Sequence, residues 1–259
     1  MRIHVLPDRA GIGTVGAALV AAAVRDTPDL LLGVATGSSP EPVYAALAAR
    51  VAGGLDLGGL SAVALDEYVG LPVDHPESYR SVVRRTVVRP LRLDPARVAV
   101  PDGTAADPSA AADAYDAAIV ARGGVDLQIL GLGHNGHVAF NEPGSSFASR
   151  TRVVALTART RAANARFFGG DVDAVPTHAV TQGIGTVLQA RRLLLVVTGR
   201  DKAPVVAAAL TGPVDEICPG SALQTHPDVT VLLDEAAATY LDASLLDDPD
   251  RTCATAGAR

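Results

Sequence analysis

The feature that most constrains the fold is a regular alternation of short apolar runs with helical patterns. Apolar runs typical of buried strands occur at 3–6, 30–35, 62–65, 98–100, 126–132, 152–156, 193–198 and 229–233. Patterns typical of helices lie between them at 13–25, 41–51, 79–88, 109–122 and 202–210. This alternation predicts an α/β fold with a mainly parallel central sheet and helices on both faces.

The size and charge of the chain narrow the classes of protein it can belong to. Its 259 residues suffice for one large α/β domain, which we predict over 1–246. The apolar periodicity stops near 247, and we predict a flexible tail over 247–259. The formal net charge of −6 argues against nucleic acid as a partner, because such a surface needs a basic face.

Cysteine content and hydropathy bear on the cellular compartment. Cys218 and Cys253 are far apart and fit neither a disulfide framework nor a zinc pattern, so we expect reduced thiols in a cytoplasmic protein. The alanine-rich run 16–24 is short and follows Pro-Asp-Arg at 7–9, which favours a surface-docked helix over a signal peptide. No apolar run reaches membrane-spanning length, and we expect no membrane partner.

Polar residues gather where the predicted strands end. The segments 36–39, 66–68, 131–142 and 199–202 follow the second, third, fifth and seventh apolar runs. The carboxyl ends of parallel strands meet at one edge of a sheet, which is where ligands of open α/β folds bind. The sequence therefore predicts that these four segments form one site.

The segment Thr36-Gly37-Ser38-Ser39 has the character of an anion site. Ser39 suits the N-cap of the next helix and Pro40 suits its first position. Free backbone N–H groups and the helix dipole would then face a bound phosphate. The same residues also fit a plain turn before a capped helix.

A basic segment strengthens the expectation of an anionic ligand. Between Pro143 and Gly170 there is no acidic residue, and guanidinium groups suit phosphate. Lys202 follows a predicted strand and can add a charge to the same anion. A solvated helix face or a subunit contact would also explain some of these cations. The arginines of the segment are Arg150, Arg152, Arg159, Arg161 and Arg166.

Two neighbouring acids, Asp66 and Glu67, directly follow the third apolar run. A carboxylate at a strand end beside a sugar site can act as a general base, most effectively if partial burial raises its pKa. One of the two could instead cap a turn, and the sequence leaves open which acid points inward.

The glycine-rich segment 131–136 matches G-x-G-x-x-G, but a dinucleotide site also needs a following helix and a later acid. Asn-Glu-Pro-Gly at 141–144 interrupts any helix, so we do not expect a bound nucleotide. His134, His137 and Glu142 could be metal ligands, yet the zinc deaminase signature is absent. An acid–base relay is simpler: His137 moves a proton, and Glu142 and Asn135 orient it.

With these residues in place, the chain resembles the glucosamine-6-phosphate deaminase family from about residue 30 to 235. LDEYVGLPVDHPESY at 65–79 and GLGHNGHVAFNEPGSS at 131–146 are highly specific; GVATGSSP at 33–40 and VTGRDKA at 197–203 would be weak alone. SRTRVVALTARTRAANARFF at 149–168 and ALQTHPDVTVLLDE at 222–235 complete the match.

The resemblance implies a single Rossmann-like three-layer domain and a reaction without metal or organic cofactor. Glucosamine 6-phosphate and water would give fructose 6-phosphate and ammonia. His137, Glu142 and Asn135 would open the sugar ring, and Asp66 would move a proton between C2 and C1. Part of the basic segment would act as a lid. The phosphate would bind to the segment Thr36-Gly37-Ser38-Ser39, Arg166 and Lys202.

Two departures from the family pattern have consequences. Some members carry aspartate at the position of Asn135, where an amide stabilises the imidazolium of His137 less. Members activated by N-acetylglucosamine 6-phosphate carry a basic residue at the position of Val154, so we predict weak or absent activation here, although Ser145 and Arg152 are present. The family includes monomers and hexamers, so a homo-oligomer is possible.

Two other functions fit the same fold. A 6-phosphogluconolactonase-like hydrolase would need neither a ring-opening relay nor a C2 base, which leaves Asp66 unexplained. A sugar-phosphate sensor would bind without reacting. Such sensors travel with a DNA-binding helix-turn-helix, and the sequence before the first strand has no room for one.

Overall fold

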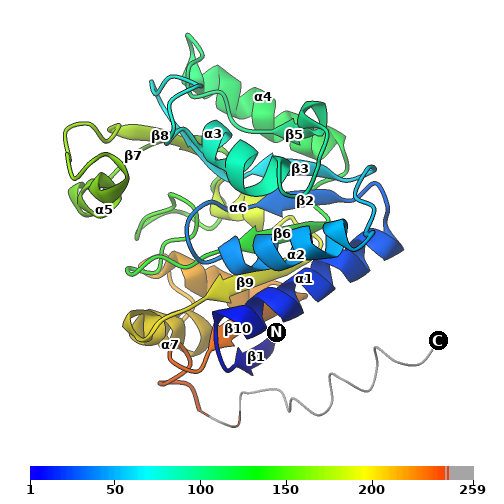
Figure 1. The fold of residues 1–259 in the computed structure, drawn as a ribbon. Coiled ribbons are helices and arrows are strands. Elements are labelled where there is room, and N and C mark those ends of the chain that lie inside the picture. The colour runs from blue at the N-terminus through cyan, green and yellow to red at the C-terminus, as the bar shows by residue number, and fades with distance from the viewer. Residues whose placement is uncertain (243, 245–259) are drawn as a thin grey trace.

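A seven-stranded parallel sheet runs through the middle of the molecule in the order β1-β10-β9-β6-β2-β3-β5 (Figure 1). The structure is a computed structural model that describes residues 1–242 and 244, so the tail predicted over 247–259 lies outside the described residues. The strands are β1 (Arg2–Leu6), β2 (Leu31–Val34), β3 (Ser61–Ala64), β5 (Val98–Ala99), β6 (Leu127–Leu130), β9 (Leu193–Val197) and β10 (Val229–Asp234).

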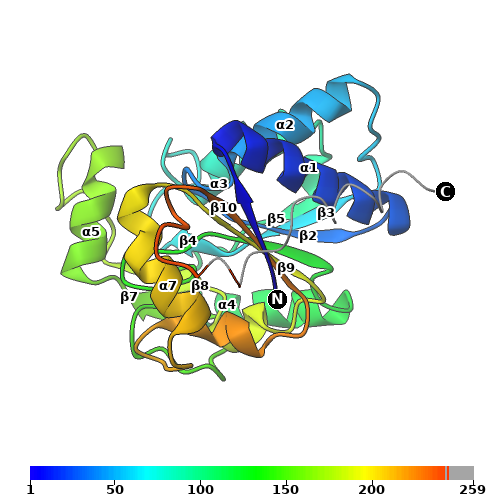
Figure 2. The ribbon, with the colours of Figure 1, turned by 90° about the horizontal axis from the view of Figure 1, so that it is seen from below.

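Helices cover both faces of this sheet, as Figure 2 shows. One layer holds α1 (Arg9–Asp26), α2 (Glu41–Ala52) and α3 (Tyr79–Val83), which continues as a π-helical turn over Arg84–Val88. The opposite layer holds α4 (Pro108–Ala121), α6 (Ile184–Val187) and α7 (Ala203–Thr211).

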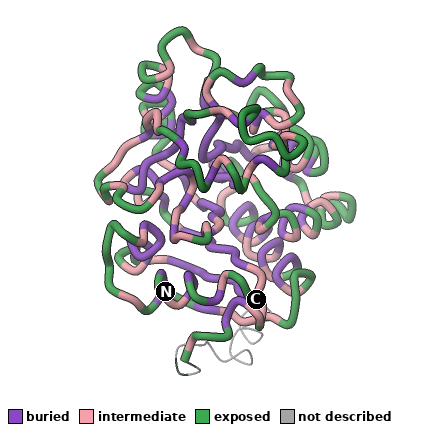
Figure 3. The backbone as a smooth tube through the Cα atoms, turned by 90° about the vertical axis from the view of Figure 1, so that its left-hand side faces the viewer, coloured by how far each residue is buried: buried purple, intermediate pink, exposed green. Residues whose placement is uncertain are grey.

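Alternate side chains of the central strands pack into two separate hydrophobic cores, one on each face of the sheet. In β9, Leu194 and Val196 pack with the layer of α1 to α3, whereas Leu193 and Leu195 pack with the layer of α4, α6 and α7. Strands buried on both faces read as continuous apolar runs. In Figure 3, buried residues gather toward the middle of the molecule. The predicted three-layer α/β architecture with a parallel sheet is confirmed.

Local sequence signals fix where the helices begin and how closely they pack. The Asp8 carboxylate accepts the backbone N–H of Gly11 at 2.8 Å and caps α1, and Asp107 caps α4 in the same way. A Cβ at Gly16 would lie 2.6 Å from a Val43 methyl group. The missing side chain therefore lets α1 approach α2.

A second, antiparallel sheet was not predicted. It consists of β4 (Asp66–Tyr68), β8 (His178–Thr181) and β7 (Arg152–Ala155) in the order β4-β8-β7. The run at 152–156 is a strand as predicted, but it belongs to this sheet. The chain changes sheets at Leu65, whose N–H donates to Val34 O at 3.3 Å while its carbonyl accepts the N–H of Gln182 at 2.8 Å.

One further helix, α5 (Ala158–Asn164), lies on the segment that joins β7 to β8. It stands beside the small sheet, to one side of the main sheet (Figure 1). We call residues 156–177 the lid segment. Within the described part of the chain, no helix combines the length and apolarity that crossing a membrane requires.

Candidate active site

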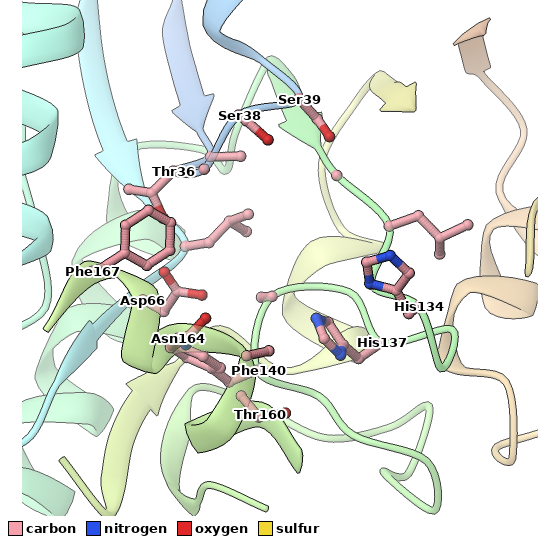
Figure 4. A pocket seen from close by; sticks show the side chains of 18 of the residues that line it. Thr36, Ser38, Ser39, Asp66, His134, His137, Phe140, Thr160, Asn164 and Phe167 are labelled. Carbon is pink, nitrogen blue, oxygen red and sulfur yellow. The ribbon is translucent and has the colours of Figure 1, made fainter. Parts of the chain in front are cut away.

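The predicted convergence of strand ends is confirmed. A cavity of about 930 Å³ opens at the carboxyl ends of β2, β3, β6 and β9 (Figure 4). Its wall includes Asp66 at the start of β4, His137 in the loop after β6, and Lys202 in the helical turn after β9. The segment 36–39 lies along the same wall, and Asp234 at the end of β10 adjoins it.

Asp66 points into this cavity from the junction of the two sheets (Figure 4). Asp66 is only 5% exposed. Burial raises the pKa of its carboxyl from 3.8 to about 8, and the charge of the neighbouring Glu67 adds to the rise. A carboxyl with this pKa can accept and return a proton near neutral pH.

Glu67 points the other way, because successive residues of β4 face opposite sides. Its carboxylate accepts the backbone N–H groups of Tyr68, Tyr79 and Arg80 at 2.8 to 2.9 Å. The two acids that the sequence could not tell apart therefore have different environments: Asp66 faces the cavity, and Glu67 joins β4 to the start of α3.

The loop after β6 is folded tightly around the His137 ring. Gly133 donates its N–H to His137 O at 2.8 Å, and a Cβ at Gly133 would lie 2.2 Å from the imidazole. Gly136 has φ +86° and completes the turn. These glycines make room for a side chain, and no helix follows them to receive a pyrophosphate.

Glu142 and Asn135 are polar neighbours of His137. Asn135 Nδ2 donates to Glu142 Oε2 at 2.6 Å, whereas His137 Nδ1 is 3.9 Å from the same oxygen and has no hydrogen-bond partner among the described residues. Burial lowers the pKa of His137, and the Glu142 carboxylate opposes that effect. The structure brings the predicted trio together without a direct bond between the histidine and the glutamate.

Lys202 also lines the cavity. Its Nζ donates to Leu132 O at 2.8 Å and lies 3.1 Å from His134 Nδ1. An ammonium group only donates, so His134 accepts at Nδ1, and its Nε2–H donates to Asp201 at 2.6 Å. This chain of contacts holds the Lys202 charge at the cavity wall. His134 is thus bound in a polar network, and the described residues contain no cluster of three or more His, Cys, Asp or Glu suited to a metal.

The prediction of Ser39 as the N-cap of α2 is wrong. The helix begins at Glu41, Pro40 occupies the cap position, and no side chain caps it. The residues from Ser38 to Pro40 form a turn, which delays the helix by one residue. The Ser39 hydroxyl, free of a capping bond, faces the cavity near Ser38 (Figure 4).

The model of the family described as "Glucosamine-6-phosphate isomerases/6-phosphogluconolactonase" matches residues 12–232. The chain belongs to this family. The glucosamine-6-phosphate deaminase of Streptomyces coelicolor is 56% identical over 242 residues, 93% of each chain. That of Mycolicibacterium smegmatis is 52% identical, also over 93% of each chain.

Solved structures of similar fold agree with this membership. A monomeric glucosamine-6-phosphate deaminase superposes with a TM-score of 0.89 at 40% identity, covering 92% of this chain and 99% of that one. The 6-phosphogluconolactonase of Trypanosoma cruzi has a TM-score of 0.76 at 22% identity, covering 93% and 97%. At that identity the second likeness shows the shared fold alone.

The arginines of the basic segment divide into two groups in this family member. Arg159 and Arg166 line the cavity. Arg150 pairs with Asp116, and Arg161 donates to the carbonyls of Val172 and Val175. Arg152 donates to Asn141 Oδ1 at 2.8 Å. Two of the five therefore face the ligand space, and three brace the surrounding loops.

Sequence reasoning missed several residues of the cavity wall. Arg9 donates to Ser38 O at 2.7 Å and to Thr198 Oγ1 at 3.2 Å, so it joins two loops of the site. Its position just after the first strand was a usable signal. Thr160 and Asn164 of α5 also line the cavity, but a threonine and an asparagine on a short helix carry no distinguishing pattern.

Proposed function

We propose that the chain converts glucosamine 6-phosphate and water to fructose 6-phosphate and ammonia. The observation that carries this proposal is the meeting of a buried carboxyl, Asp66, with His137 and Lys202 at one cavity. The deaminases named above, at 52% and 56% identity over nearly the whole chain, support the same activity.

In the proposed complex the phosphate binds to the segment Thr36-Gly37-Ser38-Ser39, with Lys202 and Arg166 as its cations. Backbone N–H groups ahead of α2 supply uncharged donors, and the helix dipole favours an anion there. Figure 4 draws Ser38 and Ser39 across the cavity from His137. A hexose phosphate can therefore extend from the phosphate segment toward the histidine.

His137 then opens the pyranose ring by moving a proton between the C1 hydroxyl and the ring oxygen. Glu142 and Asn135 set the orientation of the imidazole. Burial keeps the pKa of His137 low, so the neutral ring is available to take the first proton. The product of this step is the open-chain amino aldehyde.

Asp66, as the carboxylate, next removes the proton from C2 to give an enolamine and returns a proton to C1. The resulting C2 imine adds water and releases ammonia, which leaves the ketone of fructose 6-phosphate. A pKa of about 8 suits this task, because the group must both gain and lose a proton in each turnover. The proposed reaction uses no metal or organic cofactor, so added chelator should leave the rate unchanged.

One assay separates the candidate functions. Purified protein is incubated with glucosamine 6-phosphate, and ammonia is measured against time. Release of ammonia at a saturable rate is the expected result. Saturable binding without ammonia would favour a sensor, and hydrolysis of 6-phosphogluconolactone would favour the lactonase activity that the family description also contains. A cytoplasmic location and a homo-oligomeric state stay predictions, and sedimentation would measure the second.

A further inference from the structure

The two oxygens of the Glu142 carboxylate accept hydrogen bonds from different side chains. Oε2 accepts Asn135 Nδ2 at 2.6 Å, and Oε1 accepts the hydroxyl of Thr160 and, at 3.3 Å, that of Thr157. The nearby His137 Nδ1 is buried and has no hydrogen-bond partner among the described residues. A buried ring nitrogen without a partner is unfavourable, so this arrangement needs an explanation.

Both hydroxyls belong to the first turn of α5. Thr157 is its N-cap and accepts the N–H of Thr160 at 3.1 Å, while its hydroxyl lies 3.1 Å from that of Thr160. The helix is part of the lid segment, and Figure 4 draws Thr160 on the same side of the cavity as His137. The position of Glu142 is therefore tied to the position of α5.

The negative charge of Glu142 raises the pKa of His137. Lys202 and Arg159 are positive and disfavour a positive imidazole. The separation of 3.9 Å between His137 Nδ1 and Glu142 Oε2 exceeds the 2.7 to 3.2 Å of a hydrogen bond by roughly 1 Å. A small rotation of the carboxylate would thus decide how well the imidazolium is stabilised.

We propose that Thr160 is a positioning residue that holds the Glu142 carboxylate away from His137 until α5 moves. When the lid segment shifts over a bound sugar, the hydroxyl releases Oε1, and the carboxylate turns to accept His137 Nδ1–H. The imidazole gains its acid–base partner only in the occupied site. The consequence for turnover rests on the proposed deaminase function, but the contact itself does not.

The first test needs no substrate. The His137 ring is titrated by NMR in the intact protein, with its signal assigned from a His137→Gln spectrum. Thr160→Val removes the hydroxyl and keeps the shape of the side chain. Only the 3.3 Å contact of Thr157 then holds Oε1, so Glu142 can turn toward His137. The pKa of His137 should rise by about one unit, the lower end of what a close opposite charge produces. Thr160→Ser keeps the hydroxyl and should restore the wild-type titration.

A matched control separates positioning from loosening of the lid. Arg161→Gln removes the bonds from α5 to the carbonyls of Val172 and Val175 without touching Glu142. It should leave the titration of His137 unchanged. An unchanged pKa in Thr160→Val, or an equal rise in Arg161→Gln, would overturn the proposal. Thr160→Ala removes the same hydroxyl and serves if the valine variant folds poorly.

The kinetic test extends the proposal to turnover. The limb of the kcat/KM–pH profile that belongs to His137 should move to higher pH in Thr160→Val by the same amount as the NMR titration. An NMR shift without a matching kinetic shift would overturn the role in catalysis. Absence of ammonia release from the wild-type protein would instead count against the proposed function, and the NMR result would still decide whether Thr160 controls Glu142.

Discussion

Replacing Asp66 with asparagine should slow the enzyme and stabilise the fold at alkaline pH. The carboxyl is buried, and its pKa is raised from 3.8 to about 8. Between these two pH values the folded state keeps a proton that the unfolded state has released. The unfolding free energy of the wild type therefore falls as pH rises through this window and levels off above it. Asparagine carries no ionisable proton, so the variant escapes this loss.

The size of the effect follows from the width of the window. At about 1.4 kcal/mol per pH unit, the interval from about pH 5 to about pH 8 corresponds to on the order of 4 kcal/mol. The difference in unfolding free energy between Asp66→Asn and wild type should grow by this amount across the interval. All other titrating groups are common to both proteins, so their contributions largely cancel in the difference.

Urea unfolding at about pH 5 and about pH 8.5, followed by circular dichroism, measures the difference. Turnover of glucosamine 6-phosphate by Asp66→Asn should fall by ~10²-fold or more with substrate binding largely intact. Glu67→Gln is the matched control: its carboxylate accepts three backbone N–H bonds, so the amide should destabilise the fold at both pH values. Parallel stability–pH curves for wild type and Asp66→Asn would refute the buried-carboxyl argument, and unchanged turnover would refute the proton-transfer role.

Other changes test the remaining parts of the site. Lys202→Ala should raise KM by roughly ten-fold or more, because it removes a cation that we propose binds the phosphate, and an effect confined to kcat would contradict that role. Gly133→Ala should abolish turnover while thermal unfolding stays cooperative, because its Cβ would lie 2.2 Å from the His137 ring; full activity would show that the ring can move freely. N-acetylglucosamine 6-phosphate should leave the rate unchanged, since Val154 supplies no positive charge. A several-fold activation would contradict this prediction.

Much of the fold was predictable because the main sheet is buried on both faces. Its strands read as apolar runs, and the helices between them follow from periodicity. The first helix begins at Arg9, before the predicted residue 13, because Asp8 caps it. The small sheet was not predictable in the same way. The strand at 178–181 was not among the predicted apolar runs, and β4 consists of Asp66, Glu67 and Tyr68, which read as a polar strand end. Their pairing depends on tertiary contacts at Leu65 that no local pattern encodes.

Some residues of the site were also predictable from the sequence, and others were not. Residues at strand ends, such as Asp66, His137 and Lys202, were predictable because topology brings such ends together. The missing cap bond of Ser39 and the contact of Thr160 with Glu142 were not, because they depend on where a helix begins and on which carboxylate a hydroxyl meets. The direction of Glu67 also required the backbone N–H groups of α3 to be placed first.

The lid segment leaves and rejoins the body at a single point. Ala155 at the end of β7 lies opposite His178 at the start of β8, and Leu156 N–H donates to Thr177 O at 2.8 Å. Because the first and last residues of this segment pair with each other, the residues between them can be replaced without changing the register of β7 and β8. Relatives that act on differently shaped sugars could therefore diverge between these two residues, and a chimera carrying a foreign tip should keep the strand pairing that sets Asp66 in place.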